Sequence, residues 1–333
     1  MLENHWYVGS ASSQLGEAPK AIAVMDQRIV LYRGADGGAP HALEDRCCHR
    51  GVPLSIGKVV DQNIACGYHG WQYDGAGRCV HVPSLCAGAA IPSGFKVRSF
   101  PCVEQDHYVW VWLGPDEPPA PPRRIRGAQE YAWKQGSVDA KCSALLFLEN
   151  MLDGAHPVFA HKGTHPAWFF HKLNGFKEYE YEVRVTDYGY ALFYPATPSP
   201  DAPIPDDADS FTTFELPDRV TVLQKGAATD FYNVLHMVPT GPGTCRIEWM
   251  SRKRGDRPCV EWVPLEPKTL EQDRVLQESA QLNYARAGAD FERSVPADYA
   301  TLLTRKILKL AQAGRWDSGR QTLVQRKLVL VRQ

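Results

Sequence analysis

The first third of the chain alternates short apolar segments with turn-forming residues. Residues 21–25, 28–33, 41–45 and 107–114 are rich in β-branched, aliphatic and aromatic side chains, and polar or glycine-containing segments separate them. Apolar runs of this length, bounded by turn residues, are typical of strands rather than helices. We therefore predict an all-β domain over residues 1–114.

A proline-rich segment interrupts this pattern. Five prolines lie between residues 115 and 122. Proline lacks the backbone N–H that a sheet ladder requires and stiffens the chain, so such a segment does not enter the interior of a sheet. We predict a linker over residues 115–125 and a second domain over residues 126–333.

The second domain combines helical and strand patterns. Residues 143–156 are typical of a helix that ends before Pro157, and residues 178–265 contain segments that alternate like antiparallel strands. Two further helical patterns cover residues 270–294 and 296–314. The order of helix, strands and helices predicts an α+β domain.

Charge and cysteine content limit the partners and the compartment. The 37 basic and 38 acidic side chains give a formal net charge of -1, so the chain lacks the positive field that binds nucleic acid or an anionic membrane. It also lacks the ~18 consecutive apolar residues of a membrane span. Because no secretory signal precedes the nine cysteines, we expect them in a reducing cytoplasm rather than in disulfides.

Two Cys-to-His pairs are the most informative motif. Cys47 and His49 form the first pair, Cys66 and His69 the second, and 16 residues separate them. A Rieske [2Fe-2S] cluster binds two thiolates on one iron and two imidazoles on the other, so each loop must supply one of each. Zinc accepts the same four ligands, but zinc fingers pair Cys with Cys and His with His. The pattern therefore favours a Rieske cluster over zinc.

A second metal motif begins at Asp153 and continues through His156 and His161. Iron(II) that activates O2 favours two imidazoles and one carboxylate on one face of the metal. Residues five apart on a regular helix point about 140° apart, so the two histidines meet only if the chain bends at Pro157. Asp153 shares the helix face of His156. The alternative interpretation is a capped helix with a core histidine.

Both motifs resemble those of the ring-hydroxylating Rieske oxygenases. The resemblance over residues 6–112 rests on the run 51–54 after the first histidine, Gly70-Trp71 after the second, and the turn at 74–77. Residues 149–161 resemble the iron motif of the family, most closely in its vanillate and dicamba O-demethylase branch. This resemblance implies an α+β chain with an N-terminal all-β Rieske [2Fe-2S] domain and a helix-grip-type catalytic domain.

The resemblance also implies two cofactors and their ligands. The ligands of the [2Fe-2S] cluster would be Cys47, His49, Cys66 and His69. His156 and His161 would bind one mononuclear Fe(II). Asp153 would relay electrons from a Rieske histidine, and Asn150 would lie near the iron.

The third iron ligand is expected to be an acid from a C-terminal helix. We choose Asp298, which stands at the start of the helical pattern over residues 296–314. Asp290 and Glu292 are the alternatives. Asp298 has a second explanation, because an acid in the first turn of a helix also favours the helix dipole.

The activity that the resemblance implies is that of a terminal oxygenase. The resemblance also implies that the oxygenase is a homotrimer. It would bind O2, receive electrons from a separate NAD(P)H-dependent reductase, directly or through a ferredoxin, and hydroxylate or oxidatively demethylate a small aromatic or heterocyclic substrate. Two alternatives stay open: a cis-dihydroxylating ring dioxygenase, and a non-catalytic Rieske redox carrier with an apolar binding domain. A carrier has no need of the iron motif.

Candidate pocket residues are aromatic. They are Trp168, Phe169, Phe170, Phe231 and Tyr232. Because the same side chains would also fill an ordinary core, they do not identify a substrate.

Overall fold

The computed structural model describes two compact units. The described residues are 2–86, 88–129, 132–161, 178–193, 210–225, 230–254 and 266–332. The first unit comprises residues 3–129 and 239–242, and the second comprises residues 1–2, 130–238 and 243–333. The division between the units therefore falls just beyond the segment expected as a linker.

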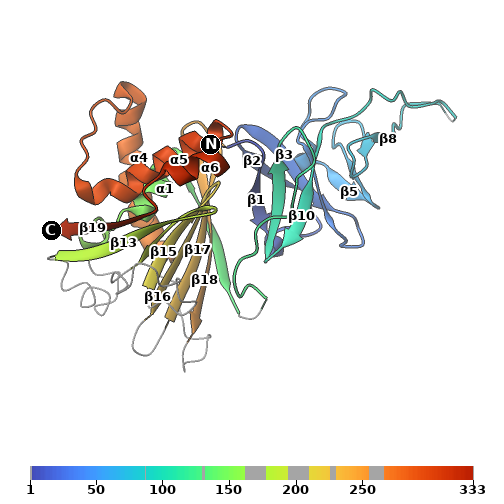
Figure 1. The fold of residues 1–333 in the computed structure, drawn as a ribbon. Coiled ribbons are helices and arrows are strands. Elements are labelled where there is room, and N and C mark those ends of the chain that lie inside the picture. The colour runs from blue at the N-terminus through green and yellow to red at the C-terminus, as the bar shows by residue number, and fades with distance from the viewer. Residues whose placement is uncertain are drawn as a thin grey trace. The chain divides into compact units, whose positions relative to one another are not determined.

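The first unit consists of short antiparallel strands (Figure 1). Its elements are β1 (His5–Ala11), η1 (Ser12–Gln14), β2 (Lys20–Val24), β3 (Gln27–Arg33), β4 (Pro40–Glu44), η2 (Leu54–Ile56), β5 (Lys58–Val60), β6 (Asn63–Ala65), β7 (Gln72–Tyr73), β8 (Cys79–His81), β9 (Ser99–Phe100), β10 (Cys102–Gln105) and β11 (Tyr108–Leu113). They form three sheets, in the orders β1-β11-β10, β2-β3-β4-β9 and β5-β6-β7-β8. The predicted all-β domain is confirmed.

The proline-rich segment packs against this unit. The Trp6 indole N–H donates to the Ala120 carbonyl at 2.8 Å. The buried Asp106 carboxylate accepts hydrogen bonds from the Arg124 guanidinium at 2.8 Å and the Ile125 backbone N–H at 2.7 Å. Prolines keep the segment out of the sheets, but its remaining polar groups hold it on the unit's surface.

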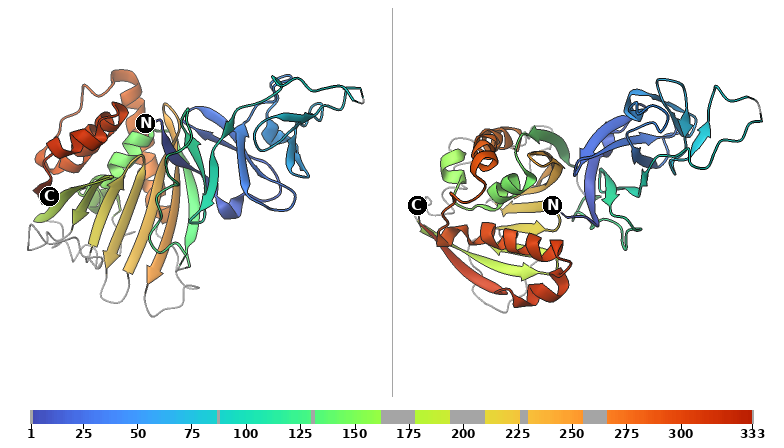
Figure 2. Two further views of the ribbon diagram at one scale, coloured as in Figure 1. Left: turned by 45° about the vertical axis from the view of Figure 1, so that its right-hand side comes forward. Right: turned by 90° about the horizontal axis from the view of Figure 1, so that it is seen from above.

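The second unit is one large antiparallel sheet with helices (Figures 1 and 2). Its elements are β12 (Lys134–Ala140), α1 (Ala144–Leu152), α2 (Pro157–Ala160), β13 (Glu178–Thr186), β14 (Gly189–Phe193), β15 (Ser210–Glu215), β16 (Arg219–Lys225), β17 (Asp230–Gly241), β18 (Thr244–Arg254), α4 (Glu266–Ala287), η5 (Pro296–Asp298), α5 (Tyr299–Gln312), α6 (Trp316–Gly319), η6 (Arg320–Thr322) and β19 (Arg326–Arg332). The strand order is β12-β18-β17-β16-β15-β14-β13-β19. The predicted α+β class is confirmed.

The main core of this unit lies between the sheet and its helices. On β14, Tyr190 and Leu192 pack into this core, whereas Phe193 belongs to a small cluster on the opposite face. Leu303 and Ile307 of α5 are buried four residues apart and therefore face the same core. Burying each of these side chains contributes about 1.5–3 kcal/mol.

Most of the candidate pocket residues lie outside the described part of the chain. Residues 168–170 and the side chain of Phe231 are outside it, so their role as pocket residues is an expectation only. The Tyr232 ring is buried, and the Arg252 guanidinium lies 4.7 Å from its centroid. None of the described helices combines the length and apolar character needed to cross a membrane.

Candidate metal sites

Two loops of the first unit present the Cys-to-His pairs in the same backbone conformation. The Cys47 N–H donates to the carbonyl of Val52 at 2.8 Å, and the Gly51 N–H donates to the carbonyl of Cys47 at 2.9 Å. In the second loop, bonds of 2.8 and 3.0 Å join Cys66 to Trp71 and to Gly70 in the same way. Gly51 and Gly70 have φ of 75° and 70°, which a residue without a Cβ adopts freely. Matching loops place two equivalent ligand pairs together.

The side chains of these loops fit a Rieske cluster. Burial raises the pKa of the Cys66 thiol, and the neighbouring Cys47 thiol raises it further. The rings of His49 and His69 lie with centroids 4.7 Å apart. Within the described part of the chain, the buried Nδ1 of His49 has no hydrogen-bond partner. Two thiols side by side, two imidazoles side by side and an unsatisfied ring nitrogen suit a cluster in which two thiolates bind one iron and two imidazoles bind the other.

Two aromatic residues hold this pair of loops. The ring of His49 stacks on Trp71 at 4.5 Å, with planes 1° apart. The Tyr73 hydroxyl accepts a hydrogen bond from the Cys48 backbone N–H at 3.2 Å and lies 3.1 Å from the Cys47 sulfur. Because its oxygen accepts from Cys48, the hydroxyl hydrogen is available to a cluster sulfur.

In the second unit the chain leaves α1 before the two histidines. The predicted helix over residues 143–156 is shorter than expected: it begins after Ser143, whose hydroxyl accepts the Leu146 N–H, and ends at Leu152. Asp153 has extended backbone angles, with φ -79° and ψ 114°. A new helical turn, α2, starts at Pro157.

The two histidines flank α2 and lie close together. The Nε2 atoms of His156 and His161 are 3.2 Å apart. The residues between them, Pro157–Ala160, form a helical turn, and the backbone departs from helical angles at His161, with φ -112° and ψ 19°. The bend expected at Pro157 is instead a break at Asp153, and Pro157 begins a new helical turn.

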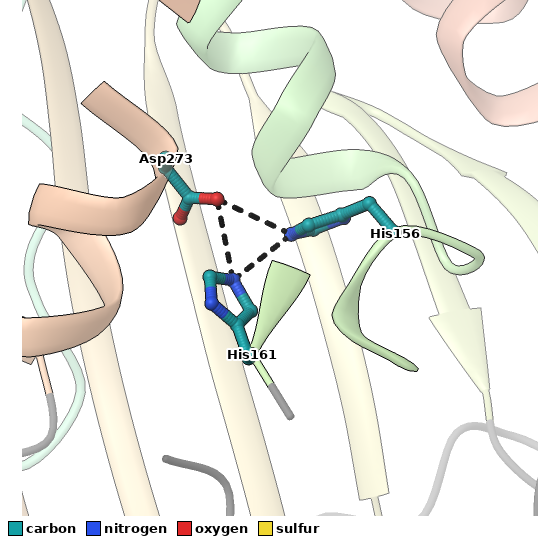
Figure 3. A group of neighbouring side chains, drawn as sticks. All are labelled: His156, His161 and Asp273. Atoms are coloured by element: carbon teal, nitrogen blue, oxygen red, sulfur yellow. Dashed lines mark hydrogen bonds and ion pairs between the residues drawn. The ribbon is translucent and has the colours of Figure 1, made fainter. Parts of the chain in front are cut away.

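The carboxylate that joins the histidines is Asp273 of α4 (Figure 3). Its Oδ1 lies 3.2 Å from His161 Nε2 and 3.6 Å from His156 Nε2, and Asp273 is 1% exposed. Three perpendicular ligands at about 2.1 Å from one ion would be about 3.0 Å apart. The observed separations fit a metal held by two imidazoles and a carboxylate on one face.

The hydrogen-bond partners of the two histidine Nδ1 atoms determine which ring nitrogen faces the metal position. His156 Nδ1 lies 2.9 Å from the Asp153 backbone carbonyl, and His161 Nδ1 lies 2.9 Å from Gln272 Oε1. Both oxygens are acceptors, so each ring carries its proton on Nδ1 and presents the Nε2 lone pair.

The pKa shifts of the two histidines are opposite. Burial lowers the pKa of His156. Burial also acts to lower the pKa of His161, but the Asp273 carboxylate and Gln272 outweigh it, so this pKa is raised. A positive charge, either a proton or a metal ion, is therefore favoured between His161 and Asp273.

The structure does not place the expected third ligand beside the two histidines. Asp298 Oδ2 accepts the Val295 backbone N–H at 2.7 Å, as an acid at a helix start does, and Asp298 is not among the ligand atoms that gather around the histidines. Asp290 is exposed, and Glu292 pairs with Arg305. Leu270 and Asp273 of α4 are buried three residues apart, so an acid occupies an inward position of a mostly polar helix, and only the folded structure shows this.

Asp153 and Asn150 lie beside this site. Asp153 is half-buried, and its Oδ1 accepts the Ala155 N–H at 2.7 Å, while its backbone carbonyl contacts His156. Asn150 is buried, and its Oδ1 accepts a hydrogen bond from Gln277 Nε2 at 2.8 Å.

Comparisons with known proteins agree with this architecture. Residues 5–101 match the family model of the Rieske [2Fe-2S] domain. The oxygenase component of dicamba O-demethylase from Stenotrophomonas maltophilia is 36% identical over 192 residues, covering 56% of this chain and 53% of that protein. The vanillate O-demethylase oxygenase subunit of a Pseudomonas species is 32% identical over 173 residues, covering 49% and 46%. The chain thus spans about half the length of these relatives.

Among solved structures, a crystal structure of dicamba monooxygenase with non-haem iron and dicamba has a TM-score of 0.72. It is 25% identical, and the match covers 94% of this chain and 98% of that one. The protein therefore has the fold of a Rieske non-haem iron oxygenase, with a Rieske [2Fe-2S] domain at residues 5–101. Within that class it is related to the dicamba and vanillate O-demethylase branch, as its motifs predicted.

Proposed function

We propose that this chain is the terminal oxygenase of a multi-component monooxygenase that hydroxylates or oxidatively demethylates a small aromatic or heterocyclic compound. The observation that carries the proposal is the convergence of His156, His161 and Asp273 in a chain with a Rieske domain. A Rieske cluster supplies single electrons, and iron(II) held by two imidazoles and a carboxylate supplies a site for O2 activation. The names of the two relatives support an O-methyl substrate.

The overall reaction consumes one O2, two electrons, two protons and the substrate, and it yields the hydroxylated product and water. Hydroxylation of an O-methyl group gives a hemiacetal, which collapses to a phenol and formaldehyde. The electrons come from a separate NAD(P)H-dependent reductase, directly or through a ferredoxin. Because Cys47 and Cys66 must stay reduced to bind iron, a reducing compartment such as the cytoplasm suits the protein.

The chain's own residues prepare the site for this chemistry. Asp153 and Gln272 hold the Nδ1 protons of the two histidines, and the 1% exposed Asp273 supplies the negative charge that balances a dication. Asp153 is also our candidate for the relay of electrons from a Rieske histidine. In the homotrimer that we propose, this histidine is His69 of a neighbouring chain.

The test is a metal and turnover assay on the reconstituted full chain. We expect about three irons per chain, two of them in a cluster with a Rieske-type electron paramagnetic resonance signal after reduction. With a surrogate reductase, methoxy- and N-methyl-substituted aromatic compounds should stimulate O2 uptake and formaldehyde release. Zinc in place of the cluster, two irons per chain, or O2 uptake that no substrate stimulates would each contradict the proposal, and a dihydrodiol product would indicate dioxygenation.

The roles of Asp153 and of the trimer have their own test. We expect a particle of about 112 kDa, three times the 37.2 kDa of one chain. Asp153→Asn keeps an acceptor for the Ala155 N–H but loses the charge, whereas Asp153→Ala loses both. Both variants should retain metals and trimer and lose most turnover. A fully active monomer, or normal single-turnover electron transfer in Asp153→Ala, would refute these roles.

A further inference from the structure

The Asn150 side chain is incompletely satisfied in a buried position. Asn150 lies on α1, is 7% exposed, and uses Oδ1 to accept the hydrogen bond from Gln277. Its Nδ2 is buried and has no hydrogen-bond partner among the residues that the structure describes. A buried amide N–H2 without an acceptor is costly, and native proteins retain one mainly where a bound group or water completes it.

This amide lies close to the metal ligands. Gln277 follows Asp273 by four residues on α4, so the two side chains share a helix face and are about 6 Å apart along the axis. Asp273 contacts His156 and His161, and Gln277 contacts Asn150. The Asn150 amide is therefore held by a residue of α4 one helical turn from Asp273.

Gln277 determines which end of this amide is free. Its Nε2 can only donate, so it binds the oxygen of Asn150 and leaves the nitrogen for another partner. We propose that Gln277 is a positioning residue: it keeps the Asn150 N–H2 group as a hydrogen-bond donor to the acceptor atom of a small ligand on the open side of the triad of His156, His161 and Asp273. This inference rests on the proposed function, because it requires a metal at the triad.

The chain offers a matched control on the same helix. Gln281, one turn beyond Gln277, uses its Oε1 to accept the Ser143 backbone N–H at 2.8 Å. A glutamate at 281 keeps an acceptor oxygen, whereas a glutamate at 277 loses the donor and turns the Asn150 nitrogen toward itself. The same substitution is therefore expected to disturb the Asn150 amide at position 277 and to leave it unchanged at position 281. Gln277→Met removes the donor without adding a charge.

The experiment uses the full chain with its cluster oxidised and Co(II) added to the triad. Azide, a small anion that binds metals and accepts hydrogen bonds, is titrated while the electron paramagnetic resonance of Co(II) is followed. Gln277→Met, Gln277→Glu and Asn150→Ala should weaken azide binding about tenfold or more, the effect of one lost hydrogen bond to a charged group. Gln281→Glu should bind azide like the native chain, and all four variants should still bind Co(II).

The outcomes separate this inference from the function on which it rests. Failure of the native chain to bind Co(II) at the triad would overturn the proposed function. Co(II) binding with no azide binding, or with equal azide affinity in the native chain, Gln277→Met and Asn150→Ala, would overturn the inference alone. A loss confined to Gln277→Glu would assign the effect to the added charge and would also overturn it.

Discussion

Removal of the Asp273 carboxylate is the most direct test of the candidate iron site. In the structure its Oδ1 lies within 3.6 Å of both histidine Nε2 atoms, and Asp273 is 1% exposed. Asp273→Ala should therefore remove one of three ligands and the only negative one among them. Asp298→Ala is the matched control, because that carboxylate binds the Val295 N–H at the start of a helix.

The size of the effect follows from metal linkage. Residues that only orient a ligand change metal affinity about 10–100-fold, so loss of a direct ligand should cost at least about 100-fold. At a Co(II) concentration about 100 times the native Kd, binding raises the free energy of unfolding by about 2.7 kcal/mol, and by only about 0.4 kcal/mol after a 100-fold loss of affinity. For a unit of this size the difference lowers the metal-dependent rise in Tm by roughly 5–9 °C.

The metal-free variant should behave differently with pH. The pKa of His161 is raised despite its burial, because of the Asp273 carboxylate and Gln272. A raised histidine pKa contributes stability that is fully present below the unfolded value of about 6.5 and is lost as pH rises through the folded pKa. Asp273→Ala removes most of this contribution. Without metal, the variant's free energy of unfolding should therefore fall furthest below that of the native chain in acid, and the difference should be small at pH values above the folded pKa.

The assay compares chelator-treated native chain, Asp273→Ala and Asp298→Ala by thermal unfolding with and without Co(II). Calorimetric titration of Co(II) gives the affinities. We expect the metal-dependent rise in Tm in the native chain and in Asp298→Ala, and little in Asp273→Ala. The reasoning is refuted if Asp298→Ala abolishes the rise while Asp273→Ala retains it.

Three further changes test other parts of the structure. Tyr73→Phe removes a hydroxyl that lies 3.1 Å from the Cys47 sulfur. Loss of this hydrogen bond should lower the reduction potential of the cluster by roughly 20–60 mV in a redox titration. An unchanged potential would show that the hydroxyl does not donate to a cluster sulfur. Arg305→Met leaves the Glu149 carboxylate without its cation, although burial already raises the pKa of this carboxyl group. Denaturant unfolding should therefore show that the free energy of unfolding falls by about 3–5 kcal/mol at neutral pH, and by less as pH falls toward 4.5. An equal loss at all pH values would contradict this. Cys66→Ala should bleach the cluster yet keep the rise in Tm with Co(II), and loss of both would mean that the two sites are not independent.

The sequence by itself determined the parts of the sites that are local in the chain. Cys47 and His49 are two residues apart and share one loop, as do Cys66 and His69, so their spacing alone indicated a cluster. His156 and His161 were recognisable for the same reason, but the helix before them ends at Leu152, and Pro157 begins a new turn rather than ending the helix. Short apolar runs bounded by turn residues likewise predicted the strands of the first unit, and alternation of apolar residues predicted those of the second.

Only the tertiary structure decided which acid lies against the two histidines. Asp273 and Asp298 both belong to C-terminal helical segments, and nothing in their immediate neighbours states which of them faces the histidines. Packing of α4 against α1 turns Asp273 inward. Gln277 of α4 donates to the Asn150 amide oxygen and Gln281 accepts the Ser143 N–H, and these two hydrogen bonds fix how the helices align. Asp298 instead accepts a backbone N–H at its own helix start. Which acid completes a metal site depends on how two helices more than a hundred residues apart pack, and no local pattern carries that information.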